Sequence, residues 1–196
     1  HKARMIVINQ LDSENANFEK VMNEISAKFG PSVVPIQLPI IEGGVFKGYV
    51  DIVHMVGKLF DGKGEKEIEI PTNLKKEADS LSEKLTEAAA EADEELMEKY
   101  LETFELSREE MLKGLSVGVR DGVITPVTCV SAAQNIGVST LLDNLVYYLP
   151  SAELAKAPKA TSAKTGAEVV VAQNGKFAAQ VVKTTFDQFG KYSIVK

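Results

Sequence analysis

The sequence has only one cysteine, no long apolar run and no excess of positive charge. The single cysteine, Cys129, lies in an apolar segment and cannot form a disulfide within the chain, which suits a reducing compartment. Every apolar run is shorter than a membrane span, and no segment resembles a signal peptide. We therefore expect a soluble, cytoplasmic protein without membrane contacts.

Basic residues are outnumbered by acidic ones, and the formal net charge is −6 over 196 residues. A chain of this charge has no general electrostatic reason to bind nucleic acid, so we expect no direct nucleic-acid binding. The hydrophobic fraction of 44% and the charged fraction of 26% are those of a globular chain with room for one or two domains.

The start of the chain predicts a strand, a loop and a helix, as in an α/β fold. Met5–Ile8 is continuously apolar, which is typical of a strand buried on both faces. Apolar residues then recur at helical spacing over Phe18–Phe29, and Gly30-Pro31 ends that helix. Residues 33–40 predict another strand, but its two prolines restrict it to a sheet edge or an irregular strand.

The middle of the chain predicts a hairpin followed by helices. Residues 45–53 and 65–70 have strand patterns on either side of a flexible turn at residues 61–64. An apolar stripe over residues 72–102 indicates one long helix or a broken pair of helices, with acidic residues on the other faces.

A further helix, a buried strand and a last helix complete this part of the chain. Ser107 and Glu110 have the spacing of a capping box at a helix start. Residues 123–130 predict a second buried strand, and residues 140–149 an amphipathic helix. The end of the chain, residues 168–196, alternates as β structure does, although about thirty residues are too few for a stable β domain of their own.

Polar residues follow the two predicted buried strands. Asn9, Gln10 and Asp12 come after the first strand, and Ser131-Ala132 after the second. In a parallel sheet, ligands collect at the carboxyl ends of the strands. A carboxylate such as Asp12 accepts hydrogen bonds from the ring N–H and the amine of guanine, a donor pair that adenine lacks.

The other residues of these two loops complete this hypothesis. The small side chain of Ala132 allows its backbone N–H to approach the guanine carbonyl oxygen, and Asn9 ties the two loops together. Two simpler interpretations remain open: Asp12 as the N-terminal cap of the first helix, and Ser131 as a turn or cap residue.

The chain resembles elongation factor G, the translocation GTPase of bacterial translation, and in particular the elongation-factor-G-like proteins. The resemblance runs through nearly the whole chain in family order. It rests on these segments: Asn9–Asp12, Asn15–Phe18, Val34–Pro39, Phe46–Asp51, Glu94–Leu101, Pro126–Cys129, Ser131-Ala132, Asn135–Val138, Leu149–Ser151 and Thr184–Tyr192.

The resemblance implies the domain organisation. Residues 1–32 and 122–150 would be the second half of a P-loop GTPase-type domain, and residues 33–121 an inserted α+β subdomain that faces the ribosomal stalk protein. Residues 151–167 would be a linker. Residues 168–196 would be the incomplete start of a β-barrel second domain.

The resemblance also implies a bound GTP or GDP in the intact protein, with the base held by Asn9, Gln10, Asp12, Ser131 and Ala132. The phosphate loop Gly-x-x-x-x-Gly-Lys-[Ser/Thr], which the family carries upstream, is not in this chain. Because that missing part holds the phosphates and magnesium, we expect no bound cofactor and no GTP hydrolysis from this chain alone. The family's Asn-Lys-x-Asp motif has Gln10 in place of its lysine, which predicts looser nucleotide binding.

Two other functions remain open. The parent protein is alternatively a degenerate, ribosome-associated docking protein with weak or no nucleotide binding, and Gln10 favours this view. Residues 33–121 alternatively form a stand-alone interaction module. The acidic residues between 77 and 110 are a solvated helix face or a docking surface. Cys129 is expected in the core, and His54 is expected to be structural or at the surface.

Overall fold

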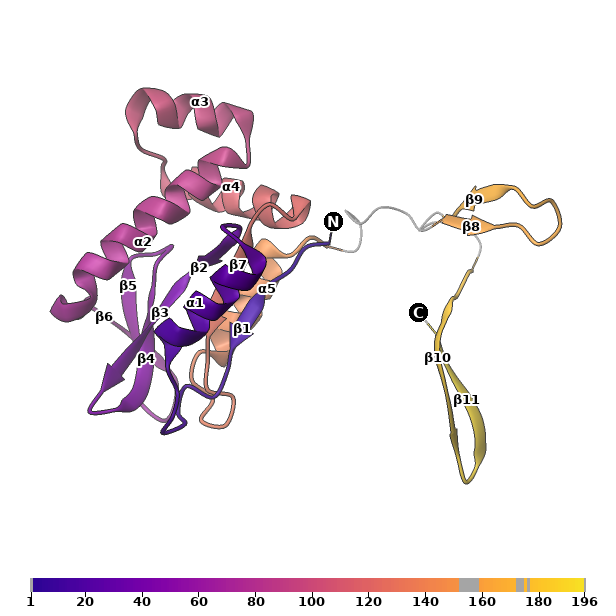
Figure 1. Cartoon of the computed structure of the whole chain (residues 1–196), viewed down its shortest axis with the longest axis horizontal. Coiled ribbons are helices and arrows are strands. Elements are labelled where there is room, and N and C mark those ends of the chain that lie inside the picture. Colours follow the sequence, from indigo (N-terminus) through magenta and orange to yellow (C-terminus); the bar gives the residue numbers. More distant parts are fainter. Residues whose placement is uncertain (1, 152–158, 172–174, 176, 196) are drawn as a thin grey trace. The chain divides into compact units, whose positions relative to one another are not determined.

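The computed structural model describes residues 2–151, 159–171, 175 and 177–195, and the chain divides into two compact units, residues 1–150 and 151–196. The first unit contains two sheets and five helices in mixed α/β order (Figure 1). The α/β class predicted from the sequence is therefore confirmed. The second unit contains only β-strands among its described residues.

A three-stranded parallel sheet is formed by strands from the beginning and from near the end of the first unit. Its strands are β1 (Ile6–Ile8), β7 (Thr125–Cys129) and β2 (Val33–Pro35), in the order β1-β7-β2. The helix α1 (Phe18–Phe29) follows β1, and α5 (Val138–Tyr148) follows β7. Residues far apart in the sequence thus form one sheet, with β7 at its centre and every residue of β7 buried.

A four-stranded antiparallel sheet follows along the chain. It comprises β3 (Gln37–Glu42), β4 (Val45–Asp51), β5 (Val56–Phe60) and β6 (Glu65–Ile68) in sequence order. The turn predicted at residues 61–64 is present, but the strand that it joins to β6 is β5, which was not predicted; the predicted strand 45–53 is β4, which pairs with β3 and β5.

The two sheets are joined without a loop. The predicted strand 33–40 is interrupted at Ile36, which separates β2 from β3. The Ile36 N–H donates to the Val127 carbonyl at 3.0 Å, and the Ile36 carbonyl accepts the Ile52 N–H at 3.1 Å. Both β2 and β3 are edge strands of their sheets, as the two prolines predict. By sheet membership, Val33–Pro35 belong with β1 and β7 rather than with the sheet that follows.

Three helices lie at one end of the first unit: α2 (Thr72–Glu91), α3 (Glu94–Thr103) and α4 (Arg108–Asp121) (Figure 1). The stripe over residues 72–102 is therefore a broken pair of helices. The predicted capping box is confirmed, since the Ser107 Oγ accepts the Glu110 N–H at 3.3 Å and the Glu110 Oε2 accepts the Ser107 N–H at 2.8 Å.

A glycine allows α2 and α4 to pack closely. A Cβ atom added to Gly114 would lie 2.3 Å from the carbonyl oxygen of Ala89, so only glycine fits at this crossing. Leu85 and Leu115 are almost wholly buried beside it. The helices therefore pack on the core with one apolar face while their acidic faces stay outside.

The described residues of the second unit form two antiparallel pairs, β8 (Lys159–Thr161) with β9 (Glu168–Val170), and β10 (Val181–Asp187) with β11 (Gly190–Val195). All their residues are exposed. Within the predicted linker of residues 151–167, Lys159–Thr161 form β8 and pair with β9; residues 152–158 lie outside the described residues.

Candidate functional site

The carboxyl ends of β1 and β7 lie side by side. The parallel register pairs Ile8 with Cys129, and the Val130 N–H donates to the Ile8 carbonyl at 2.9 Å. The loops that leave these two strands therefore start from adjacent points, as expected for parallel neighbours. These loops contain the five site residues predicted from the sequence.

Asn9 connects the two loops directly. Its Oδ1 atom accepts the backbone N–H of Gln10 at 2.8 Å and that of Ala132 at 3.0 Å. The predicted tie between the loops is thus present. The Ala132 N–H, expected from the sequence to point freely toward a base, is instead engaged by this side chain.

Asp12 lies half-buried beyond Asn9, and its Oδ1 atom is buried without a hydrogen-bond partner among the described residues. The interpretation of Asp12 as a helix cap is wrong, because Asn17 caps α1 by accepting the Lys20 N–H at 2.8 Å. A buried oxygen left without a donor costs about 1–3 kcal/mol. Because this oxygen is closed to solvent, the donor of a ligand would reach it only after the loop shifts.

Gln10, between these residues, has a left-handed backbone with φ of 63° and an exposed side chain. Non-glycine residues seldom adopt this conformation, which concentrates at ligand sites and tight turns. The Gln10 carbonyl accepts the Ser13 N–H at 3.0 Å, so the loop folds back into a turn.

Ser131 has a structural role in its loop. It is fully buried, its backbone pairs with Ile136 through two hydrogen bonds of 3.0 Å, and its Oγ accepts the Gln134 N–H at 3.2 Å. The interpretation of Ser131 as a turn residue is therefore confirmed. The bridge between Ser131 and Ile136 closes the loop and leaves Ala132 at its exposed tip.

Glu65 of β6 holds the far end of the same loop, which the sequence reasoning missed. Its Oε1 accepts the Gly137 N–H at 3.1 Å, and its Oε2 accepts the Thr140 hydroxyl at 2.9 Å. The Tyr49 hydroxyl lies 2.6 Å from the same Oε2 and 2.5 Å from the Thr140 oxygen. Burial, followed by the hydrogen bond to Glu65, raises the pKa of Tyr49.

Neither Cys129 nor His54 belongs to this site. Cys129 is fully buried, and burial raises the pKa of its thiol, so it is the predicted core residue and a poor nucleophile. The His54 Nδ1 lies 2.8 Å from the Oδ2 of Asp51, and burial raises the pKa of Asp51 to about 6. This pair is therefore a structural contact at the end of β4.

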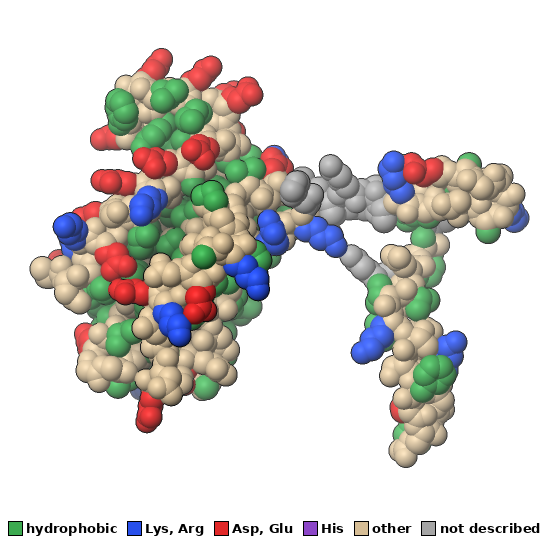
Figure 2. Space-filling view, viewed as in Figure 1, with side chains coloured by type: hydrophobic (Ala, Val, Ile, Leu, Met, Phe, Trp, Pro, Cys, Tyr) green, Lys and Arg blue, Asp and Glu red, His purple; other side chains and the backbone are tan. Residues whose placement is uncertain are grey.

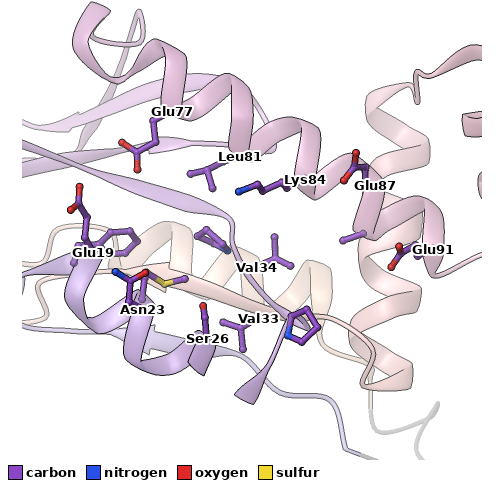
Figure 3. A pocket seen from close by; sticks show the side chains of 15 residues that line it. Glu19, Asn23, Ser26, Val33, Val34, Glu77, Leu81, Lys84, Glu87 and Glu91 are labelled. Atoms are coloured by element: carbon purple, nitrogen blue, oxygen red, sulfur yellow. The ribbon is translucent and has the colours of Figure 1, made fainter. Parts of the chain in front are cut away.

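A groove of about 540 Å³ lies elsewhere in this unit, between α1, β2 and α2 (Figure 3). Val33, Val34 and Leu81 form apolar parts of its lining. Its charged lining is mainly acidic and includes one basic side chain, Lys84. The acidic residues are Glu19, Glu77, Glu87 and Glu91. None of the five predicted site residues lines this groove, so it is separate from the two loops.

Acidic side chains are also abundant on the helices at the end of the unit, and Figure 2 shows many of them on the visible face around α2 and α3. Glu94 and Glu95 lie in the first turn of α3, where they complement the positive end of the helix. Asp93 caps this helix and is paired with Lys113 at 3.2 Å.

Within the described residues, no helix is both long and apolar enough to cross a membrane. The same part of the chain brings together no group of three or more histidine, cysteine, aspartate or glutamate side chains that would hold a metal ion.

No protein-family model matches the chain. A crystal structure of a protein from Thermus thermophilus is similar over 99% of this chain, with 28% sequence identity and a TM-score of 0.79. This chain spans 27% of the length of that Thermus chain. The arrangement of strands and helices described here is thus similar to that of a segment within a longer protein.

Proposed function

We propose that this chain is the guanine-recognition part of a translational GTPase similar to elongation factor G. The observation that carries the proposal is the buried, unpartnered Oδ1 of Asp12, placed beside two loops that Asn9 already holds together. An unpaired carboxylate of this kind matches the adjacent N–H and amine donors of guanine, because a carboxylate accepts both at once.

The other loop residues have defined parts in this proposal. Asn9 uses its oxygen for the two loops, which leaves its amide nitrogen to contact the base. The Ala132 N–H reaches the guanine carbonyl by sharing its proton between that oxygen and Asn9. Ser131 contributes by closing the turn that presents Ala132.

Phosphate binding, magnesium and hydrolysis are assigned to a part of the protein outside this chain. The proposal is supported by the similarity to a Thermus chain of which this chain spans 27%. In the intact protein we propose a GTP–GDP cycle in the elongation step on the ribosome, in the cytoplasm. For residues 33–121 we propose the ribosomal stalk protein as the partner, with the acidic helix surfaces as the docking face.

The second candidate is a ribosome-associated docking protein with weak or no nucleotide binding. Gln10 is the observation that favours it, since a lysine at this position would place its alkyl stem and charge along the nucleotide. The acidic groove at α1 and α2 is compatible with both functions.

Calorimetry on the protein encoded by the complete gene tests the proposal. We expect the protein to bind GDP more tightly than ADP. Asp12→Asn should weaken the binding of GDP and strengthen that of xanthosine diphosphate. In xanthine a carbonyl replaces the guanine amine, and this carbonyl accepts a hydrogen bond from the asparagine amide. Equal binding of GDP and ADP would contradict guanine recognition. Gln10→Lys distinguishes the two candidates. If the Gln10 protein shows no detectable GDP binding and the lysine variant binds GDP, the result supports docking as the main role.

A further inference from the structure

We propose that Glu65 is a positioning residue for the base-recognition loop, through which the antiparallel sheet sets nucleotide affinity. The inference rests on the proposed function and adds a residue that the family motifs do not contain. The observation behind it is the position of the Glu65 carboxylate, which lies against the loop of residues 131–137 and the first turn of α5.

The loop is held at both ends by side chains from elsewhere in the chain. At one end Asn9 accepts the Ala132 N–H, and at the other Glu65 accepts the Gly137 N–H, 72 residues away in sequence. Between these contacts, the bridge from Ser131 to Ile136 closes the loop through its own backbone. Loss of either side chain therefore releases one end of the loop.

Glu65 also contacts the start of α5, which lacks a capping side chain. Gly137, the N-cap residue of α5, has no side chain, and no side-chain cap is present at this end within the described structure. The carboxylate of Glu65 instead accepts from the backbone N–H of Gly137 itself and from the hydroxyl of Thr140 in the first turn. A negative group there is favoured by the positive end of the helix.

The position of Glu65 is itself fixed from its own sheet. Tyr49, fully buried on β4, places its hydroxyl within hydrogen-bond distance of both Glu65 and Thr140. Gly137 has φ of 77°, and a Cβ there would lie 2.9 Å from the Cys129 carbonyl oxygen, so this backbone has little room for an alternative path. A shift of β6 relative to α5 thus moves the loop that presents Ala132.

Hydrogen exchange of the present 196-residue chain tests the mechanical part without any nucleotide. Glu65→Ala should speed amide exchange in peptides covering residues 131–140, while Glu67→Ala, an exposed glutamate on the same strand, should leave them unchanged. Glu65→Gln keeps an acceptor for Gly137 and should be intermediate. If Glu65→Ala does not fold, Glu65→Gln alone decides: exchange identical to the unmodified chain would overturn the proposal.

Calorimetry with GDP on the complete protein tests the functional part. Glu65→Ala should weaken GDP binding at least about fivefold, the lower end of typical coupling between sites, with Glu67→Ala unchanged. GDP binding by the unmodified protein that is equally tight in Glu65→Ala would overturn the inference and leave the proposed function intact. Absence of GDP binding by the unmodified protein would overturn both, whatever the exchange shows.

Discussion

The Oδ1 atom of Asn9 accepts the backbone N–H of Ala132 at 3.0 Å, across 123 residues of sequence. The same oxygen accepts the Gln10 N–H, so one side chain orders both loops. The two loops are therefore preorganised by the protein itself, which lowers the ordering cost that a ligand would otherwise meet on binding.

Replacing Asn9 by alanine should separate the loops. Two backbone donors lose their acceptor, and we expect the free energy of unfolding to fall by about 1 kcal/mol. Urea unfolding followed by circular dichroism measures this change, and amide exchange at residues 131–134 should rise. The exposed Asn73 on α2 provides the control: Asn73→Ala should change neither quantity, and a similar loss in both variants would contradict the tie.

Asp12→Ala should leave stability unchanged or raise it by up to about 1 kcal/mol, because it removes a buried oxygen that has no donor in the described structure. The same change should abolish preference for guanine in the complete protein. Thermal unfolding without nucleotide measures the first effect, with Asp143→Ala on the exposed face of α5 as the control. A loss above about 1 kcal/mol would show that Asp12 is mainly structural.

Gly114→Ala should destabilise the chain although alanine is the better helix former. The added Cβ would lie 2.3 Å from the Ala89 carbonyl oxygen, so α2 and α4 must move apart. We expect a net loss of about 1–3 kcal/mol in urea unfolding. Gly64→Ala is the matched control, since a Cβ at Gly64 meets nothing within 4 Å. Equal stability of both variants would contradict the close helix crossing.

The buried carboxyl of Asp51 should make stability depend on pH. Burial raises its pKa from 3.8 to about 6, against the opposing charges of Lys58 and Arg108. Between these values only the unfolded chain releases the proton, so the free energy of unfolding should fall as pH rises from about 4 to 6, on the order of 2 kcal/mol.

Well above this range the Asp51 contribution should be constant, because both states are then ionised. Asp51→Asn, which keeps an acceptor for the His54 N–H, should remove this slope while His54 stays in place. Urea unfolding at closely spaced pH values gives the comparison. Parallel curves for the two proteins would show that Asp51 is not the titrating group.

Local signals predicted the features that depend on neighbours in sequence. The capping box at Ser107, the end of α1 at Gly30 and the edge position of the segment with two prolines all follow from residues within one or two turns. The meeting of Asn9 with Ala132 was also predictable, because the carboxyl ends of neighbouring parallel strands must share an edge.

Contacts made across the two sheets were not predictable in this way. Nothing in the pattern of β6 distinguishes Glu65 from Glu67, and only the fold brings Glu65 to Gly137. The one available sign was a glycine before a helix that lacks a capping side chain. The engagement of the Ala132 N–H was likewise missed, since it depends on which atom of Asn9 faces the second loop.

Ile36 gives the first unit a particular mechanical property. Its N–H is bonded to Val127 in one sheet and its carbonyl to Ile52 in the other, and it is only 2% exposed. In a single-molecule pulling experiment, a load applied to the antiparallel sheet would pass through this residue into β7, with no slack loop to absorb it. Rupture of the two sheets should therefore appear as one event.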